Sequence, residues 1–403
     1  MARMVRFNLL SLRLLALASL VLAAACSPSS GGTAGPTAAP TAAAPTTAPA
    51  AKPTTAPAAT TAPTNAPAAT SAPAAAGNYT PTPLNPPVKV SIGLLASSSD
   101  GGIFLANDRG YFKQEGIDLD IQRFQTLVDM VAPLSTGQLQ IAAGGLAASL
   151  YNAANRELGM RIVADKGQTP SPEWDFSALI IRKDLIDSGR VKDYSDLKGL
   201  TLVTSGRGNS PEVSLATALK KGGLTLKDIN YSQMGFPDMV TALSTRGIDG
   251  GIVIEPFKSR IVSEGSGVVF KSNLDIFDGK NQEIAVIVYG EDFAKNKEVA
   301  QHWMNAYIRG LRDYNDAFGP KKQGYQEAVK TLVENTTVKD PKVYDQMAPA
   351  GLDPDGKLDV QSMQNDLNYY LESGQVQSQV DLGKLIDTSF QEAAVKALGP
   401  YQK

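Results

Sequence analysis

The chain has 403 residues, of which 43% are hydrophobic and 19% charged, and its 38 basic and 40 acidic side chains give a formal net charge of −2 at pH 7. This balance argues against a general nucleic-acid binder, which carries a clear excess of positive charge. One cysteine and one histidine exclude internal disulfides and zinc sites built from His and Cys, whereas an all-carboxylate calcium site stays open.

The first 26 residues have the features of an export signal. Three arginines precede a short apolar run, and small residues lead up to Cys26. A membrane span needs about 20 apolar residues, so this run is too short to be one. The segment 21–26 resembles a bacterial lipobox, with Ala23 where leucine is commoner. The resemblance implies that residues 1–25 are removed and that Cys26 carries a lipid; a plain signal peptide with an incidental cysteine is the alternative.

Residues 26–86 are almost entirely Ala, Pro, Thr and Ser, with Lys52 as the sole charge. Such a segment cannot bury a core. Its proline content favours an extended stalk that reaches on the order of 150 Å, at about 3.1 Å per residue. An O-glycosylated variant of the stalk is also compatible with the composition. No later segment is apolar enough to cross a membrane, so we expect contact with the bilayer through the lipid.

From residue 88 onward, short strands and helices alternate, which is typical of an α/β sheet with parallel strands. Apolar residues at alternate positions predict a strand at 88–92, and a helix that begins at 103 can end in a left-handed cap at Gly110. The other predicted elements of this part are a strand at 117–121, a helix at 127–134, an apolar segment at 139–142 followed by a turn at 143–145, and a strand at 161–164.

A second set of α/β units begins with the apolar run 177–182, which can be a strand that crosses between two lobes. The strand at 200–203 leads into a helix for which Ser210 is the predicted N-cap and Pro211 the first helical residue. The remaining predicted elements are a helix at 237–243, strands at 251–254 and 284–288, and C-terminal helices at 299–318, 328–333 and 385–398.

Three sequence blocks carry a resemblance to a known family. GYFKQEGI at 110–117, DLKGLTLV at 196–203 and GIDGGIVIEPF at 247–257 resemble blocks of solute-binding proteins that serve importers of alkanesulfonates, taurine, nitrate, thiamin pyrimidine precursors and riboflavin. The third block departs from the family pattern where Gly250 and Gly251 replace two alanines. One block alone is weak, but three in order, behind a lipobox and a stalk, make the resemblance specific.

The resemblance implies a two-lobed α/β fold of the type II periplasmic-binding-protein kind, with parallel-rich sheets, a cleft and a helical C-terminal segment. The expected layout assigns 87–180 and 284–403 to the first lobe and 181–283 to the second. Ligand contacts with both lobes would stabilise a closed form, which docks on a membrane permease driven by a cytoplasmic ATPase. We therefore expect a lipid-anchored protein on the extracytoplasmic face of the cell membrane, with no enzymatic step and no cofactor.

Ligands of such folds bind beyond the carboxyl ends of strands, which selects the candidate binding residues. The loop 206–210 resembles a family turn that can hold a polar group on backbone amides. Each candidate has a structural alternative, such as a helix cap for Glu255, a solvated side chain for Arg207 or a packing role for Trp174. The candidates are Ser98, Ser99, Asp100, Tyr151, Asp165, Trp174, Arg207, Asn209, Ser210 and Glu255, with Phe236 as a further aromatic face.

Aromatic and carboxylate side chains outnumber arginines near the expected cleft, which favours a heteroaromatic vitamin or vitamin precursor, riboflavin or a thiamin pyrimidine precursor. An alkanesulfonate, taurine or nitrate is the alternative. The rival class is an enzyme, because one branch of the family makes the thiamin pyrimidine. That branch relies on an active-site histidine and a cysteine-rich motif, whereas His302 lies within a predicted packing helix and Cys26 precedes the stalk.

Overall fold

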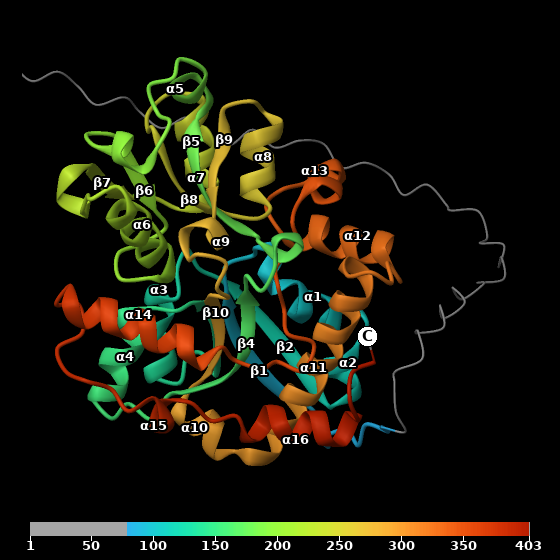
Figure 1. The fold of residues 1–403 in the computed structure, drawn as a ribbon. Helices are drawn as coiled ribbons and strands as arrows, with labels where there is room; N and C mark the ends of the chain where they lie inside the picture. Colours follow the sequence, from blue (N-terminus) through green and yellow to red (C-terminus); the bar gives the residue numbers. More distant parts are fainter. Residues whose placement is uncertain (1–78, 403) are drawn as a thin grey trace, which may run out of the picture. The chain divides into compact units, whose positions relative to one another are not determined.

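Two five-stranded sheets, each surrounded by helices, organise residues 79–402, which are the residues that the computed structural model describes (Figure 1). The predicted signal, Cys26 and positions 26–78 of the predicted stalk lie outside the described residues. The strands are β1 Val88–Leu94, β2 Ile117–Arg123, β3 Ile141–Gly145, β4 Arg161–Gln168, β5 Ser177–Arg182, β6 Thr201–Thr204, β7 Asn230–Gln233, β8 Gly250–Ile254, β9 Gly267–Ser272 and β10 Glu283–Tyr289.

Helices fill the connections between the strands and the whole C-terminal part. The α-helices are α1 Gly101–Asp108, α2 Tyr111–Gln114, α3 Val128–Ser135, α4 Ala148–Asn155, α5 Lys183–Asp187, α6 Ser210–Lys221, α7 Phe236–Ser244, α8 Phe257–Ser263, α9 Asn273–Ile276, α10 Glu291–Lys295, α11 Lys297–Phe318, α12 Tyr325–Asn335, α13 Pro341–Gln346, α14 Val360–Glu372, α15 Leu382–Leu385 and α16 Ser389–Leu398. Short 3-10 helices are η1 Ser98–Asp100, η2 Pro172–Trp174, η3 Tyr194–Leu197 and η4 Leu226–Asp228. None of these helices is long and apolar enough to span a membrane.

The two sheets have the same spatial arrangement of strands, although the antiparallel strand comes last along the chain in the first sheet and first in the second. The first has the order β2-β1-β3-β10-β4 and the second the order β7-β6-β8-β5-β9. In each sheet three neighbouring strands are parallel and the fourth, β10 or β5, is antiparallel to both of its neighbours. The predicted α/β class with two parallel-rich sheets is confirmed. We call β1–β4, β10 and their helices the first lobe, and β5–β9 with α5–α9 the second lobe.

Both faces of the first sheet are buried. Every residue of β10 is buried, as expected for a continuous apolar strand inside a sheet with helices on both faces. Val286 and Val288 pack in one cluster with residues of α3, α4 and α14, while Ile287 and Tyr289 pack in another with α1 and α11. Alternate side chains of one strand thus contact the helices on opposite faces.

The second sheet is covered in the same manner. Leu179 and Ile181 of β5 pack with Leu215 of α6, whereas Ile180 packs with Met239 of α7. Strand β5 lies wholly in this sheet, so positions 177–180, which the expected layout gave to the first lobe, pair with β8 and β9.

The chain passes between the lobes twice, after β4 and before β10, and the two connecting segments contact each other. Thr169 of the first segment donates its amide to the carbonyl of Gln282 in the second, at 3.2 Å. Asn273 Nδ2 donates to Thr169 Oγ1, also at 3.2 Å. Paired crossings of this kind form the hinge in proteins whose two lobes rotate relative to each other.

Three local expectations were wrong. The predicted turn at 143–145 belongs to β3, where Gly144 lets the strand pass Leu127: a Cβ there would lie 2.8 Å from Leu127 Cβ. The predicted helix at 385–398 is two helices, α15 and α16. Residues 79–86, predicted as the end of the stalk, lie against the first lobe, where Tyr79 donates its hydroxyl to Glu115 Oε1 at 2.7 Å.

Candidate functional site

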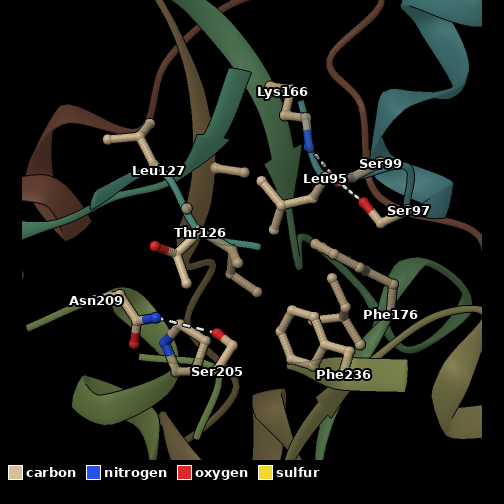
Figure 2. Close-up of a pocket in the computed structure, with 15 residues that line it drawn as sticks. Leu95, Ser97, Ser99, Thr126, Leu127, Lys166, Phe176, Ser205, Asn209 and Phe236 are labelled. Carbon is tan, nitrogen blue, oxygen red and sulfur yellow. Dashed lines mark hydrogen bonds between the residues drawn. The ribbon is translucent and has the colours of Figure 1, made fainter. Parts of the chain in front are cut away.

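A small cavity of about 30 Å³ lies where the loops of the two lobes meet (Figure 2). That volume has room for about two water molecules. Loops and strand ends of both lobes contribute to its wall, at the carboxyl ends of β1, β3, β6 and β8. The lining residues are Leu95, Ser97, Ser99, Thr126, Leu127, Gly145, Lys166, Ile284 and Ala285 from the first lobe, with Phe176, Ser205, Asn209, Pro211, Phe236 and Ile254 from the second lobe and its connection.

One wall of the cavity is polar and is centred on Lys166 of β4. Its side chain is 1% exposed, and its Nζ lies 2.8 Å from Ser99 Oγ and 2.7 Å from Asp100 Oδ1. Ser97 completes this wall: its Oγ lies 3.0 Å from Ser99 Oγ and its amide donates to Asp100 Oδ2 at 2.8 Å. Figure 2 shows Lys166 pointing toward the two serines. The wall therefore offers an ammonium group and hydroxyls, with the positive charge compensated by Asp100.

Asn209 supplies polar groups from the opposite lobe. Its Oδ1 accepts the amide of Glu212 at 3.2 Å, and its Nδ2 donates to Ser205 Oγ at 3.0 Å. Asn209 is thus the N-cap of α6, and the prediction of Ser210 as the cap was wrong by one residue. Ser210 instead donates its hydroxyl to the carbonyl of Ile284 at 2.6 Å, which ties the start of α6 to the first lobe.

Aromatic and aliphatic side chains form the rest of the wall. Phe236 at the start of α7 stacks on Phe257, with ring centroids 5.9 Å apart and an interplanar angle of 18°. Phe176, fully buried, approaches the cavity from the segment before β5. Leu95 and Leu127 complete the apolar surface on the first lobe (Figure 2). The site thus combines two aromatic rings with a few polar groups, the usual composition of a small-molecule pocket.

Backbone hydrogen bonds join the two lobes around the cavity. Ser210 donates its amide to the carbonyl of Leu146, and Ala148 donates its amide to the carbonyl of Gly208, both at 2.8 Å. These two bonds flank an antiparallel bridge between Ala147 and Asn209. The described conformation is therefore closed at this edge of the site.

Two of the predicted residues lie next to the cavity without lining it. Ser98 donates its hydroxyl to the carbonyl oxygen of Glu255 at 3.0 Å, a contact between the lobes. The Glu255 carboxylate turns toward α8, where it accepts the amide and the hydroxyl of Ser259, each at 2.9 Å. Burial raises the pKa of Glu255, and the ammonium of Lys258 at 3.2 Å opposes that rise. Glu255 therefore has the capping role that was its structural alternative.

Tyr151 and Asp165 lie in the interior of the first lobe, away from the cavity lining. Tyr151 is fully buried beside Tyr370, and its hydroxyl donates to the carbonyl of Met363 at 3.1 Å. Asp165 accepts the amides of Gly167 and Asp353 at 2.7 and 2.6 Å, and burial raises its pKa to about 7. Both side chains are structural in this conformation, against the expectation of ligand contact.

Trp174 and Arg207 also fall outside the cavity. Arg207 is exposed to solvent. Trp174 packs against Tyr314 with ring centroids 6.5 Å apart. Together with Tyr401 and other residues, it lines a separate cavity of about 350 Å³. Of the ten predicted binding residues, the structure brings Ser99 and Asn209 together at the cavity, with Asp100 directly behind Ser99.

Sequence reasoning missed Lys166, Phe176 and Ser205. The strand predicted at 161–164 continues to Gln168, and this extension places Lys166 at the site. A charged residue directly after a buried strand was the available signal for it. Ser205 precedes the loop 206–210 by one residue and was detectable on the same argument as Asn209.

His302 is engaged outside the site. Its Nδ1 lies 2.7 Å from Glu115 Oε2, and it does not line the cavity. Within residues 79–402 there is no group of three or more His, Cys, Asp or Glu side chains arranged to hold a metal ion.

Comparison with solved structures identifies the fold. The alkanesulfonate-binding protein SsuA of Xanthomonas axonopodis pv. citri, bound to MOPS, matches 75% of this chain and 99% of its own, with a TM-score of 0.61 and 15% identity. The periplasmic nitrate-binding protein NrtA of Synechocystis PCC 6803 matches 77% of this chain and 89% of its own, with a TM-score of 0.62 and 13% identity. The fold is therefore that of periplasmic binding proteins, as predicted.

The alignments with sequence relatives cover only part of this chain and part of each relative. A candidate binding protein of Brucella abortus is 27% identical over 214 residues, which cover 53% of this chain and 62% of the relative. The 4-amino-5-hydroxymethyl-2-methylpyrimidine phosphate synthase of Schizosaccharomyces pombe is 28% identical over 153 residues, 38% of this chain and 40% of the synthase. The family model described as "NMT1/THI5 like" matches residues 98–316, more than half of the chain. The chain belongs to the NMT1/THI5-like family.

Proposed function

We propose that this chain is the solute-binding protein of an ABC importer, and that it captures a small heteroaromatic vitamin or vitamin precursor between its lobes. The observation that carries the proposal is the lining of the cavity. Its single charged lining residue, Lys166, is already paired with Asp100, while Phe176 and Phe236 face the same space. This combination suits a flat, uncharged ring whose edge forms hydrogen bonds.

The role as a binding protein is supported by the fold and by the position of the site. The solved structures that share the fold include binding proteins for alkanesulfonates and nitrate, and the Brucella abortus relative is named as a candidate binding protein. The cavity lies beyond the carboxyl ends of strands from both sheets, where ligands of such folds bind. Closure of two lobes about paired crossings needs no chemical step.

The ligand enters only if the lobes separate. Small-molecule pockets occupy about 300–1,000 Å³, whereas the cavity of the described conformation is about 30 Å³. Rotation about the two connecting segments, after β4 and before β10, would widen it, because its lining comes from both lobes. A thiamin pyrimidine precursor requires less opening than riboflavin, and both present hydrogen-bonding edges to Lys166, Ser97 and Asn209.

The cellular context of the proposal comes from the sequence. An export signal, a lipid on Cys26 and an extended stalk would hold the lobes on the extracytoplasmic face of the cell membrane. From there the closed form would deliver its ligand to a membrane permease driven by an ATPase.

An anion is the second candidate ligand, and a specific observation favours it. The ammonium of Lys166 and the hydroxyls of Ser97 and Ser99 converge on one wall, a donor set that could hold a sulfonate or nitrate if Asp100 moved aside. The pairing with Asp100 makes this ligand class second, because the carboxylate would repel a bound anion. A pyrimidine-synthase activity has less support, since His302 pairs with Glu115 outside the cavity.

Thermal unfolding of the protein, stripped of ligand by refolding, tests the proposal against riboflavin, hydroxymethylpyrimidine, taurine, an alkanesulfonate and nitrate. A ligand that binds only the folded state raises the midpoint once its concentration exceeds the dissociation constant. We expect a shift with riboflavin or the pyrimidine, lost in F236A and kept in W174A, whose side chain lies outside the cavity. A shift with the anions alone would replace the vitamin by an anion as the ligand class.

A further inference from the structure

Glu212 stands out among the buried charged groups of the second lobe, because the side chains that hydrogen-bond it come from both lobes. It lies in the first turn of α6 and is 0% exposed. Oε2 accepts the hydroxyl of Tyr231 on β7 at 2.7 Å. Oε1 accepts the hydroxyl of Tyr369 on α14 at 3.1 Å and Gln375 Nε2 at 2.5 Å. The second lobe therefore satisfies one carboxylate oxygen and the first lobe satisfies the other.

The same residue also organises the loop that lines the cavity. Glu212 Oε2 accepts the amide of Gly208 at 3.3 Å, and the amide of Glu212 donates to Asn209 Oδ1 at 3.2 Å. Asn209 in turn donates to Ser205 Oγ at 3.0 Å. Glu212 thus contacts the loop 205–209 directly at Gly208 and Asn209, and through Asn209 it helps to position Ser205.

A buried carboxylate is costly unless its oxygens are hydrogen-bonded. With the lobes apart, Tyr369 and Gln375 would move away with the first lobe and Oε1 would keep no side-chain donor from the second. With the lobes together, both donors return and Val213, the next residue on α6, packs in the same cluster as Tyr370. Closure therefore completes the hydrogen bonding of Glu212 without any contact with the cavity contents.

We propose that Glu212 is a positioning residue that couples the shape of the cavity loop 205–209 to closure of the lobes. The carboxylate holds the loop through Gly208 and Asn209, and it holds the first lobe through Tyr369 and Gln375. This role rests on the lobe closure of the proposed function. It adds a set of hydrogen bonds that favours closure without any contact with the ligand. It stabilises the closed arrangement before any ligand binds, so that less of the binding free energy is needed for closure.

Amide hydrogen exchange of the full-length, unliganded protein tests the role directly. The amides of Ala148 and Ser210 donate across the lobes, so their protection reports the closed fraction. The double variant Y369F/Q375A removes the donors of the first lobe and should accelerate exchange at both amides about tenfold or more. The single variant Y369F should produce a smaller change in the same direction.

Tyr231→Phe is the matched control, because it removes a hydroxyl from the same carboxylate within one lobe. We expect Y231F to leave the exchange of Ala148 and Ser210 unchanged relative to that of Ile252, a buried amide of β8 that reports global stability. Unchanged protection of Ala148 and Ser210 in Y369F/Q375A, or an equal loss in Y231F, would overturn the proposal. No ligand is present, so the result is independent of the thermal-shift test of ligand binding.

Discussion

Ser98 of the first lobe donates both its amide and its hydroxyl to the carbonyl oxygen of Glu255 in the second lobe, at 3.3 and 3.0 Å. Ser98→Ala removes the hydroxyl bond between two fully buried groups, so we expect the free energy of unfolding to fall by about 1 kcal/mol. Urea denaturation measures the change. Ser263→Ala removes an exposed hydroxyl that donates to a carbonyl within α8, and it should lower the free energy of unfolding by less. Equal effects of the two variants would contradict a larger contribution of the contact between the lobes.

Lys166 and Asp100 form a buried ion pair at 2.7 Å, with both side chains almost inaccessible to solvent. Lys166→Met would leave the carboxylate of Asp100 buried without its cation, and we expect a loss of about 3–5 kcal/mol in the free energy of unfolding. The double variant K166M/D100N removes both charges and should regain more than half of that loss. Urea denaturation of the four proteins in the cycle gives the coupling energy, and additive effects would contradict a direct interaction.

Asp165 and Glu283 place two buried carboxyl groups in the first lobe, at the strands that lead to the connecting segments. Burial raises the pKa of Asp165 to about 7, and burial together with the neighbouring Asp165 raises the pKa of Glu283 well above its usual range. Unfolded carboxyl groups lose their protons near pH 4. Between these pH values the folded state therefore holds protons that the unfolded state has released. The contribution of this proton binding to the free energy of unfolding is complete below about pH 4 and decreases as the pH rises to 7.

Glu283→Gln removes one of these protons from the balance. We expect the free energy of unfolding of E283Q, relative to that of the parent protein, to be greater at pH 8 than at pH 5. The difference should grow by about 1.4 kcal/mol for each pH unit over which unfolding of the parent releases one proton. Urea denaturation at the two pH values measures the gain. Asp196→Asn is the control, because backbone amides lower the pKa of Asp196 and its effect should be the same at both pH values. An E283Q effect that is also independent of pH would contradict the prediction.

Gly251 in β8 has no room for a side chain. A Cβ at this position would lie 2.4 Å from the carbonyl oxygen of Val203 on the neighbouring strand. Gly251→Ala restores the alanine of the family pattern, yet we expect it to destabilise the protein by about 1–3 kcal/mol. Gly247→Ala, where the nearest atom is 3.5 Å away, should change stability by less than about 0.5 kcal/mol. Thermal denaturation separates the two, and a neutral G251A would mean that the strands can move apart.

Strands that are buried on both faces were the most predictable elements. The apolar run 177–182 coincides with β5, and the run 284–288 lies within β10, one residue shorter at each end. In an α/β domain, a short continuous run of β-branched and apolar residues bounded by polar residues is typical of a strand buried on both faces. The helical period predicted at 299–318 likewise falls within α11, Lys297–Phe318, because a long amphipathic pattern is a strong signal.

The site was less predictable, because the direction of a side chain depends on partners far away in the sequence. Asn209 and Ser210 are equally good capping residues, and the choice between them depends on Ile284, which accepts the Ser210 hydroxyl. The predicted strand 161–164 stops before Lys166, whereas β4 includes Lys166, and its partner Ser99, 67 residues earlier, keeps the side chain buried. Tyr151 faces the core, since α4 packs between the first sheet and α14.

The two sheets differ in where their antiparallel strand lies along the chain, and this difference has a consequence for synthesis and folding. All five strands of the second sheet lie between Ser177 and Ser272, so this sheet can form from one contiguous stretch of chain. The first sheet cannot be completed until β10, Glu283–Tyr289, inserts between β3 and β4. Long-range pairings of this kind form slowly. The second lobe should therefore fold before the first, and β1–β4 wait as an incomplete sheet with exposed strand edges until β10 has been made.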